Sequence, residues 1–159
     1  MKIPFAKTFS GKDIGCIIDC SHWPADDLNA KTIRFATEYG FDIDAGLDAI
    51  LTRWDNEELN GDDSQILSDA ADESIYFLND SELPSFCSFY FEENSLFLSP
   101  SLDMAREDVG FISSKSQEYP NDDYDGEWLH ISDHGNATLY NRGIDNNGKI
   151  VDDEIWSIV

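Results

Sequence analysis

Positive charge is scarce in this sequence. Its 159 residues include 33 acidic side chains but only 10 Lys and Arg, so the formal net charge is −23 at neutral pH. A surface this negative repels the phosphates of nucleic acids and of anionic membranes, which proteins bind through Lys and Arg. We therefore expect no direct nucleic-acid binding and no membrane binding. A protein with a large basic surface would instead be attracted from a distance.

Long apolar runs and an even set of cysteines are also missing. The longest uninterrupted apolar run is Ile75 to Leu78, far short of the roughly 20 residues that span a membrane, and the N-terminal stretch lacks a signal-peptide pattern. Three cysteines in a chain of this length fit reduced thiols better than a disulfide framework. We expect a cytoplasmic protein.

Sequence signatures of enzymes are missing as well. The chain has no phosphate-binding loop, no nucleophile elbow and no recognisable triad, so we expect a protein that is not an enzyme and needs no cofactor. Cys16, Cys20 and His22 have side chains suited to zinc. A strand over residues 14–19 would separate the two thiols by about 13 Å, which is too far to share one ion. Buried thiols are the better interpretation, and no metal site is predicted.

The residues that are present indicate one folded acidic domain over 1–159, with a loosely docked N-terminal part at 1–53 as an option. Hydrophobic residues make up 41% of the chain and aromatic residues 13%, enough apolar material for a core. The apolar spacing predicts a strand at 14–19 and three helices. The first helix covers 24–39, the second begins after an N-cap at Asp44, and the third covers 62–79. Asp62 and Gln65 resemble a capping box for the third helix.

Strand patterns dominate the second half of the chain. Alternating aromatic residues predict a hairpin of 86–91 and 95–99 around Glu93 and Asn94, then a short helix at 101–110. Turn signals divide the last third into strands at 127–132, 137–141 and 154–158, an antiparallel meander. The fold class is therefore α+β, with helices in the N-terminal half, an antiparallel hairpin and a C-terminal β-meander. Trp128, His130, Tyr140 and Trp156 are expected on one face of the meander, and Leu129, Ile131, Leu139 and Ile155 on the other.

The negative charge is concentrated after residue 53. Residues 54–105 hold thirteen acids and no Lys or Arg. On the third predicted helix, four carboxylates fall within about 20° of one line, with spacings of about 10, 6 and 10 Å that are comparable with phosphate spacings along a nucleic-acid strand. We call this set the carboxylate line: Asp62, Asp69, Glu73 and Asp80. An ordinary solvated helix face is the alternative interpretation, but a field of one sign opposes folding, and exposed faces normally mix signs.

A second acidic segment lies at residues 121–126. Its oxygen-bearing side chains and Gly126 resemble the start of a calcium-binding loop. The first ligand position is Asn121 where Asp is usual, and the twelfth is Ser132 where a bidentate Glu is required. A solvated acidic turn within the same negative surface is therefore the preferred interpretation, and a calcium-binding acidic module is kept as an alternative function.

The block at 54–105 and the carboxylate line resemble the acidic nucleic-acid-mimic inhibitors that phages and mobile elements encode, of the anti-CRISPR and anti-restriction type. The resemblance is one of composition and covers roughly residues 54–127. It implies a stoichiometric inhibitor that blocks the nucleic-acid-binding groove of a host defence nuclease or CRISPR effector complex. An immunity protein that neutralises a basic nuclease toxin is the alternative within the same physics. The expected partner-binding residues are Asp55, Glu58, Asp62, Asp63, Asp69, Asp72, Glu73, Asp80, Glu92, Glu93, Asp122, Asp123 and Asp125.

Overall fold

The computed structural model describes residues 8–159. This part of the chain contains four α-helices and seven strands in two sheets, with most helices in the N-terminal half, so the α+β prediction is confirmed. Residue contacts group the chain into two compact units. The helical unit comprises Gly15–Glu82 and Ser88–Ser99, and the β unit comprises Phe9–Ile14, Leu83–Cys87 and Pro100–Val159. The sequence-based prediction of one domain, with an optional loose part at 1–53, stays a prediction.

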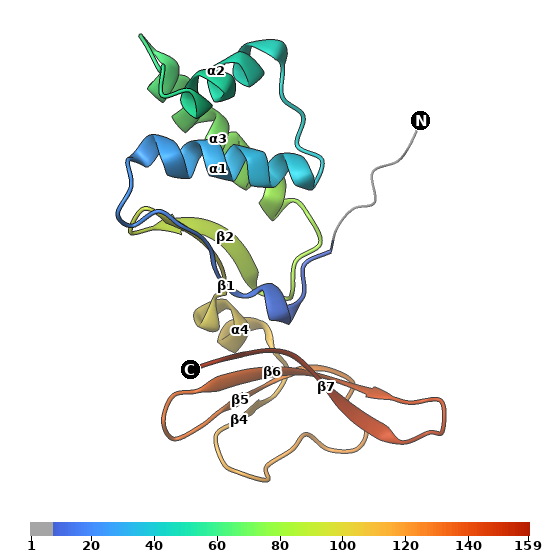
Figure 1. The fold of residues 1–159 in the computed structure, drawn as a ribbon. Helices are drawn as coiled ribbons and strands as arrows, with labels where there is room; N and C mark the ends of the chain where they lie inside the picture. The colour runs from blue at the N-terminus through green and yellow to red at the C-terminus, as the bar shows by residue number, and fades with distance from the viewer. Residues whose placement is uncertain (1–7) are drawn as a thin grey trace. The chain divides into compact units, whose positions relative to one another are not determined.

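The helical unit combines three helices with a three-stranded sheet of order β1-β3-β2. In Figure 1, α1 and α3 lie over the sheet and α2 lies beyond them. Buried side chains of α1, α2 and α3 form one apolar cluster, which includes Ile33, Leu51 and Leu67. The elements are β1 (Gly15–Asp19), α1 (Ala25–Glu38), α2 (Ala45–Asp55), α3 (Asp63–Asn79), β2 (Cys87–Glu92) and β3 (Ser95–Pro100).

Two local sequence signals form as predicted. The Asp44 side chain accepts a hydrogen bond from the Leu47 amide at 2.8 Å, which caps the start of α2. The two-residue turn between β2 and β3 has positive φ at both Glu93 (48°) and Asn94 (56°). This backbone geometry matches the twist of the two strands in a hairpin. It requires a left-handed backbone conformation at both turn residues.

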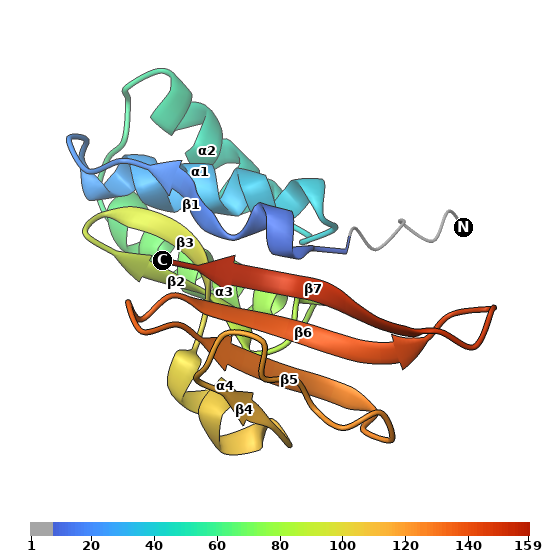
Figure 2. The same cartoon turned by 90° about the horizontal axis from the view of Figure 1, so that it is seen from below.

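The β unit is built on a four-stranded sheet of order β4-β5-β6-β7 (Figure 2). Strands β5, β6 and β7 pair antiparallel, so the predicted meander is confirmed, whereas β4 pairs parallel to β5 and was not predicted. A strand of two residues has no periodicity that a sequence could display. The elements are η1 (Gly11–Asp13), α4 (Leu102–Asp108), β4 (Ile112–Ser113), β5 (Gly126–Ile131), β6 (Ala137–Ile144) and β7 (Ile150–Ile158).

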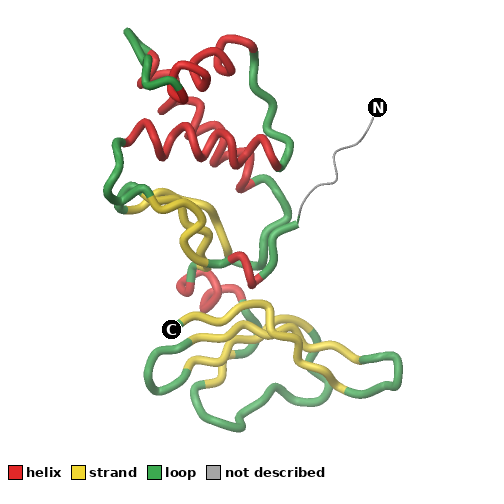
Figure 3. Tube along the Cα trace, in the orientation of Figure 1, coloured by secondary structure: helices red, strands yellow, loops and turns green. Residues whose placement is uncertain are grey.

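The η1 turn packs tightly against β7. A Cβ atom at Gly11 would lie 1.9 Å from the carbonyl oxygen of Ile155, so only glycine fits at this position. Figure 3 shows how little of the β unit is helical, with η1 and α4 as its helical segments. None of the helices in residues 8–159 combines the length and the apolar character that crossing a membrane would need.

The prediction that Trp156 shares a face with Trp128 is wrong. Leu139 pairs with Trp156 but the next residue, Tyr140, pairs with Glu154, so the register shifts at this point and Ile155 has no partner of its own. This irregularity reverses the alternation of β7, because residues directly opposite on neighbouring strands share a face. Trp156 therefore joins Leu129 and Leu139 in the core beneath α4, while Trp128 stacks on Tyr140 with ring centroids 4.7 Å apart.

Candidate functional site

The carboxylate line lies on the solvent side of α3. One side of this helix faces the core, because Leu67, Ala71 and Leu78 are fully buried. Burial of that stripe turns the opposite side of the helix outward. All four members of the carboxylate line are exposed: Asp62, Asp69, Glu73 and Asp80. Asp62 and Asp80 are the residues that flank the helix, so the line runs along its full length.

The start of α3 differs from the predicted capping box. The Asp62 side chain makes no capping hydrogen bond. The Asp63 carboxylate accepts a hydrogen bond from the Asn60 amide at 3.0 Å, but this amide lies before the helix and is not one of its free N–H groups. The exposed Asp62 carboxylate is therefore not used by its own helix. Asp69 accepts one hydrogen bond, from the neutral Gln65 amide at 2.8 Å, which leaves its negative charge uncompensated.

Asp63 is not part of the exposed surface. Its side chain is only 7% exposed and forms two hydrogen bonds with the Arg53 guanidinium, at 2.8 Å and 2.7 Å. The hydrogen bonds from Arg53, followed by that from the Asn60 amide, lower the pKa of Asp63 to about 2. This side chain is a structural ion-pair partner that joins α2 to α3, which corrects its assignment to the partner-binding residues.

The other predicted residues are exposed but belong to several different places. Asp55 forms an ion pair with Arg34 at the end of α2, so its charge is already compensated. Glu58 and Asp72 are exposed in the helical unit, on the loop after α2 and on α3. Glu92 and Glu93 are exposed at the β2–β3 turn. Asp122, Asp123 and Asp125 are exposed on a loop of the β unit.

Two exposed apolar side chains of α3 were missed in the sequence. Ile66 is 44% exposed and Tyr76 is 78% exposed. At 100° per residue, they lie about 40° to either side of the carboxylate line. The same helical projection that reveals the line could have revealed them, but Ile66 and Tyr76 look like ordinary core residues until the buried face of the helix is known.

An open groove of about 590 Å³ runs between α2 and α3 beside the carboxylate line. Its apolar lining includes Leu47, Ile50 and Ile66. Asp69 and Glu73 also line it, on the α3 side. The groove thus places apolar surface directly beside two carboxylates of the line, which is the pattern of an interface core next to a polar rim.

The acidic loop of the β unit is held by a buried arginine. Arg142, whose side chain is 5% exposed, donates hydrogen bonds to the carbonyl oxygens of Pro120 and Asn121 and pairs with both oxygens of Asp152. Asp152 also accepts a hydrogen bond from the Trp128 indole at 2.9 Å. The hydrogen bonds from Arg142 lower the pKa of Asp152. A guanidinium therefore contacts the backbone oxygens at the start of the loop that resembles a calcium site.

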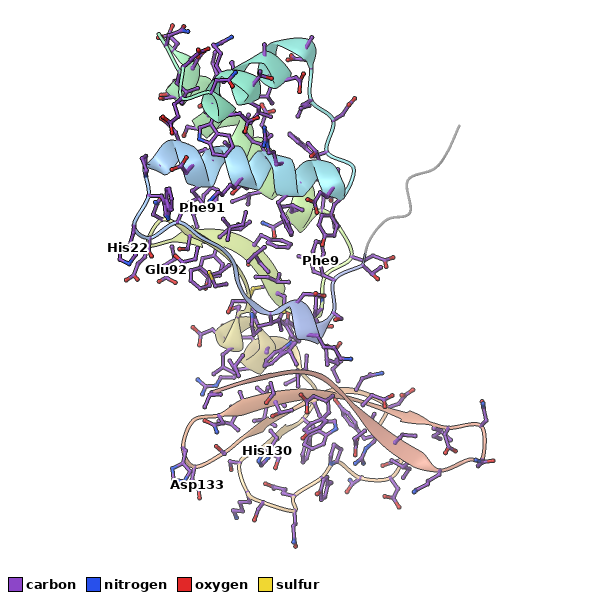
Figure 4. All side chains as sticks on the ribbon, viewed as in Figure 1. Phe9, His22, Phe91, Glu92, His130 and Asp133 are labelled. Atoms are coloured by element: carbon purple, nitrogen blue, oxygen red, sulfur yellow. The ribbon has the colours of Figure 1, made fainter. Side chains whose placement is uncertain are left out.

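Within residues 8–159, no three or more His, Cys, Asp and Glu side chains are arranged to hold a metal ion. Burial raises the pKa of the Cys87 thiol to about 12 and also raises that of Cys20, so both behave as apolar side chains. The prediction of a buried thiol is wrong for Cys16, which is exposed on β1. Figure 4 labels His22, just before α1, and His130, on β5, which come from different units. His130 Nδ1 lies 3.2 Å from the Ser113 hydroxyl oxygen, and this hydroxyl donates a hydrogen bond to the Lys115 carbonyl at 3.1 Å.

The site is chemically a surface for cations. Exposed carboxylates accept hydrogen bonds from guanidinium and ammonium groups, and the adjacent apolar groove can bury the aliphatic part of a bound side chain. Its residues come from α2 and α3, whose pairing is fixed by Arg53 and Asp63. Comparison with models of protein families, with curated proteins and with solved structures found no match to this chain.

Proposed function

We propose that this protein is a stoichiometric inhibitor that presents α3 to a basic nucleic-acid-binding protein, such as a defence nuclease or a CRISPR effector complex. The observation that carries the proposal is the carboxylate line. Its four members are exposed along one side of α3, and the sequence has no Lys or Arg between Arg53 and Arg106. The line would occupy positions that phosphates fill in the natural ligand.

The absence of balancing charge supports a functional surface over a solvated one. Surface helices commonly gain a few tenths of a kcal/mol from each pair of opposite charges one turn apart. Asp69 and Glu73 are one turn apart on α3 and are of like charge, so this pair destabilises the isolated helix by a similar amount. A sequence selected only for stability and solubility would place a Lys at one of these two positions.

The apolar side chains beside the line supply what charge alone does not. Electrostatic attraction mainly raises the rate of association, whereas the lifetime of a complex depends on buried contacts. Ile66 and Tyr76 flank the line and are exposed. Tyrosine is among the residues that most often dominate the binding energy of interfaces. A partner bound over α3 would bury both side chains.

The proposal is tested by competition for nucleic acid. Purified restriction endonucleases and CRISPR effector complexes are mixed with the protein, and binding of labelled target DNA is followed by mobility shift. Inhibition of a susceptible partner should reach completion near one equivalent and weaken as salt rises from about 50 to 500 mM, because screening shortens the range of the interaction. Binding that is insensitive to salt for every partner tested would refute the mimic mechanism.

Charge reversal provides the residue-level test. Asp69→Lys with Glu73→Lys should weaken inhibition at least tenfold, because two attractive contacts become repulsive. The matched control is Asp103→Lys with Glu107→Lys, an exposed pair with the same spacing on α4 of the β unit. The two double variants have the same net charge. Equal weakening by both would mean that total charge, and not the carboxylate line, determines binding.

A further inference from the structure

A second groove of the helical unit combines tryptophan with carboxylates. It measures about 540 Å³ and lies where the start of α1 meets the end of α2. Its lining residues are Trp23, Pro24, Asp26, Asp27, Trp54, Asp55, Glu57 and Leu59. Asp26 also accepts a hydrogen bond from the Ser64 hydroxyl at 2.8 Å, so this groove adjoins the first turn of α3. The segments that form this groove are about 30 residues apart in the sequence, so no local sequence pattern predicts the groove.

Trp54 already binds a guanidinium of its own chain. The Arg34 guanidinium carbon lies 5.2 Å from the centroid of the Trp54 ring, and the same guanidinium pairs with Asp55. The Trp54 indole nitrogen donates a hydrogen bond to Asp27 at 2.7 Å, which fixes the orientation of the ring. An aromatic face with a carboxylate beside it is the environment that a guanidinium favours, because it can stack and form hydrogen bonds at once.

The backbone of Trp23 is held in place, whereas its side chain is exposed. The indole is 63% exposed, and the Lys31 ammonium lies 5.4 Å from its ring centroid. The Asn94 side-chain amide donates hydrogen bonds to the carbonyl oxygens of Cys20 and, at 2.8 Å, of Trp23. The Trp23 amide in turn donates to the Cys20 carbonyl at 2.9 Å. A tryptophan on a fixed backbone loses little conformational freedom on binding, which makes it an efficient contact residue.

The negative charge of the groove favours a cationic ligand. Four carboxylates line it, from Asp26, Asp27, Asp55 and Glu57. None of the lining residues is Lys or Arg, and Arg34 and Lys31, which contact the two tryptophan rings, offset only part of this charge. Anions are excluded, and a cation that can stack on indole is favoured. Arginine meets both conditions better than lysine, because its planar guanidinium is more weakly hydrated and binds carboxylate through two donors.

We propose that this groove binds an arginine side chain of the basic partner, between Trp23 and the carboxylates around Trp54. The inference rests on the proposed function in taking the partner to be a basic protein. The carboxylate line would attract the partner over a distance, and the groove at the start of α3 would then hold one arginine by stacking and paired hydrogen bonds. The groove thus adds a preference for arginine to a surface that otherwise responds only to charge.

The test uses the full chain and a hexa-arginine peptide as the probe, at about 150 mM salt. Nuclear magnetic resonance follows the indole N–H signals of the four tryptophans. We expect the Trp23 and Trp54 signals to move, and those of Trp128 and Trp156, which are buried in the β unit, to stay. A hexa-lysine peptide should bind at least fivefold more weakly. Equal affinity for both peptides, or movement of neither groove signal while the peptide binds, would overturn the inference.

Variants separate the groove from the carboxylate line. Trp23→Ala should weaken hexa-arginine binding at least fivefold, and its exposed position makes loss of folding no concern. Ile144→Ala, which removes an exposed apolar side chain of the β unit, should bind as the parent does. If Asp69→Asn with Glu73→Gln weakens binding and Trp23→Ala does not, the inference fails while the proposed function stands. If Trp23→Ala weakens binding and no nuclease is inhibited, the groove stands and the proposed function fails.

Discussion

The helical unit and the β unit are both acidic, but they place their few cations differently. Among residues 8–159, the helical unit has 19 acidic residues and three basic ones, and the β unit has 14 and five. In the helical unit Lys31, Arg34 and Arg53 each contact an aromatic ring or a carboxylate. In the β unit Arg142 is buried, whereas the other four basic side chains are exposed.

The difference indicates what each unit does with negative charge. Arg34 and Arg53 compensate Asp55 and Asp63, which are not in the carboxylate line, so the line itself stays unopposed. Arg142 instead stabilises the β unit. It binds Asp152 on β7 and also the backbone of the loop that packs on Trp128. The helical unit thus carries an exposed line of carboxylates without a cation beside it in residues 8–159, whereas in the β unit a buried arginine and its partner Asp152 support the sheet.

Loss of Arg142 should cause the largest loss of stability, and this loss should be confined to the β unit. Arg142→Ala leaves Asp152 without its partner and two backbone carbonyls without donors, so we expect a loss of about 3 kcal/mol in the free energy of unfolding. Denaturant unfolding followed by near-ultraviolet circular dichroism measures this loss. Hydrogen exchange should accelerate in β5 to β7 and remain slow in α1 and α3, because local opening follows local contacts.

Lys149→Ala is the matched control, since it removes an exposed cation from the same unit. It should change the free energy of unfolding by less than about 0.5 kcal/mol. If both variants lose the same stability, Arg142 acts only through net charge. If hydrogen exchange accelerates equally in both units after Arg142→Ala, Arg142 does not stabilise the β unit separately from the helical unit.

A smaller effect on stability is expected when the helical unit is exposed to acid. The pKa of Asp63 is lowered from 3.8 to about 2 in the folded state, so the ion pair stabilises the fold fully above about pH 4. This stabilisation is lost as the pH falls through about 2, because the carboxylate must then be protonated. Asp63→Asn should lack this part of the pH dependence in helix unfolding measured by far-ultraviolet circular dichroism. An identical acid profile for parent and variant would show that the pair has no role in stability.

The smallest expected effect concerns the β2–β3 turn. Glu93 adopts a φ of 48°, which costs energy for any residue with a Cβ. Glu93→Gly should therefore raise the free energy of unfolding by about 0.5–1 kcal/mol, after the greater freedom of glycine in the unfolded chain is subtracted. Thermal unfolding measures the change, and Glu93→Gln separates the loss of charge from the relief of strain. A destabilised Glu93→Gly variant would contradict this explanation.

Sequence periodicity predicted the helices and the meander because these elements depend on local patterns. It also identified the Asp44 cap and the two-residue turn at Glu93 and Asn94, whose signals lie within a few residues. The carboxylate line follows from one helical projection, so four of the predicted site residues could be placed on a common side before the structure was known.

What sequence reasoning missed depends on contacts between distant segments. Asp63 looks like its neighbour Asp62 until α2 brings Arg53 beside it. Trp156 changes face because of an irregularity that only strand pairing reveals. The tryptophan and carboxylate groove needs Trp23 and Trp54 together, and the two residues line one groove only after α1 and α2 have packed.

The interleaving of the two units has a consequence for synthesis on the ribosome. All segments of the helical unit have been made by Ser99, whereas residues 9–14 of the β unit belong with strands at the far end of the chain. The η1 turn must wait for β7 before the close approach of Gly11 to Ile155 can form. Contacts between segments so far apart in sequence form slowly. The unit with the carboxylate line can therefore fold while the β unit is still being translated.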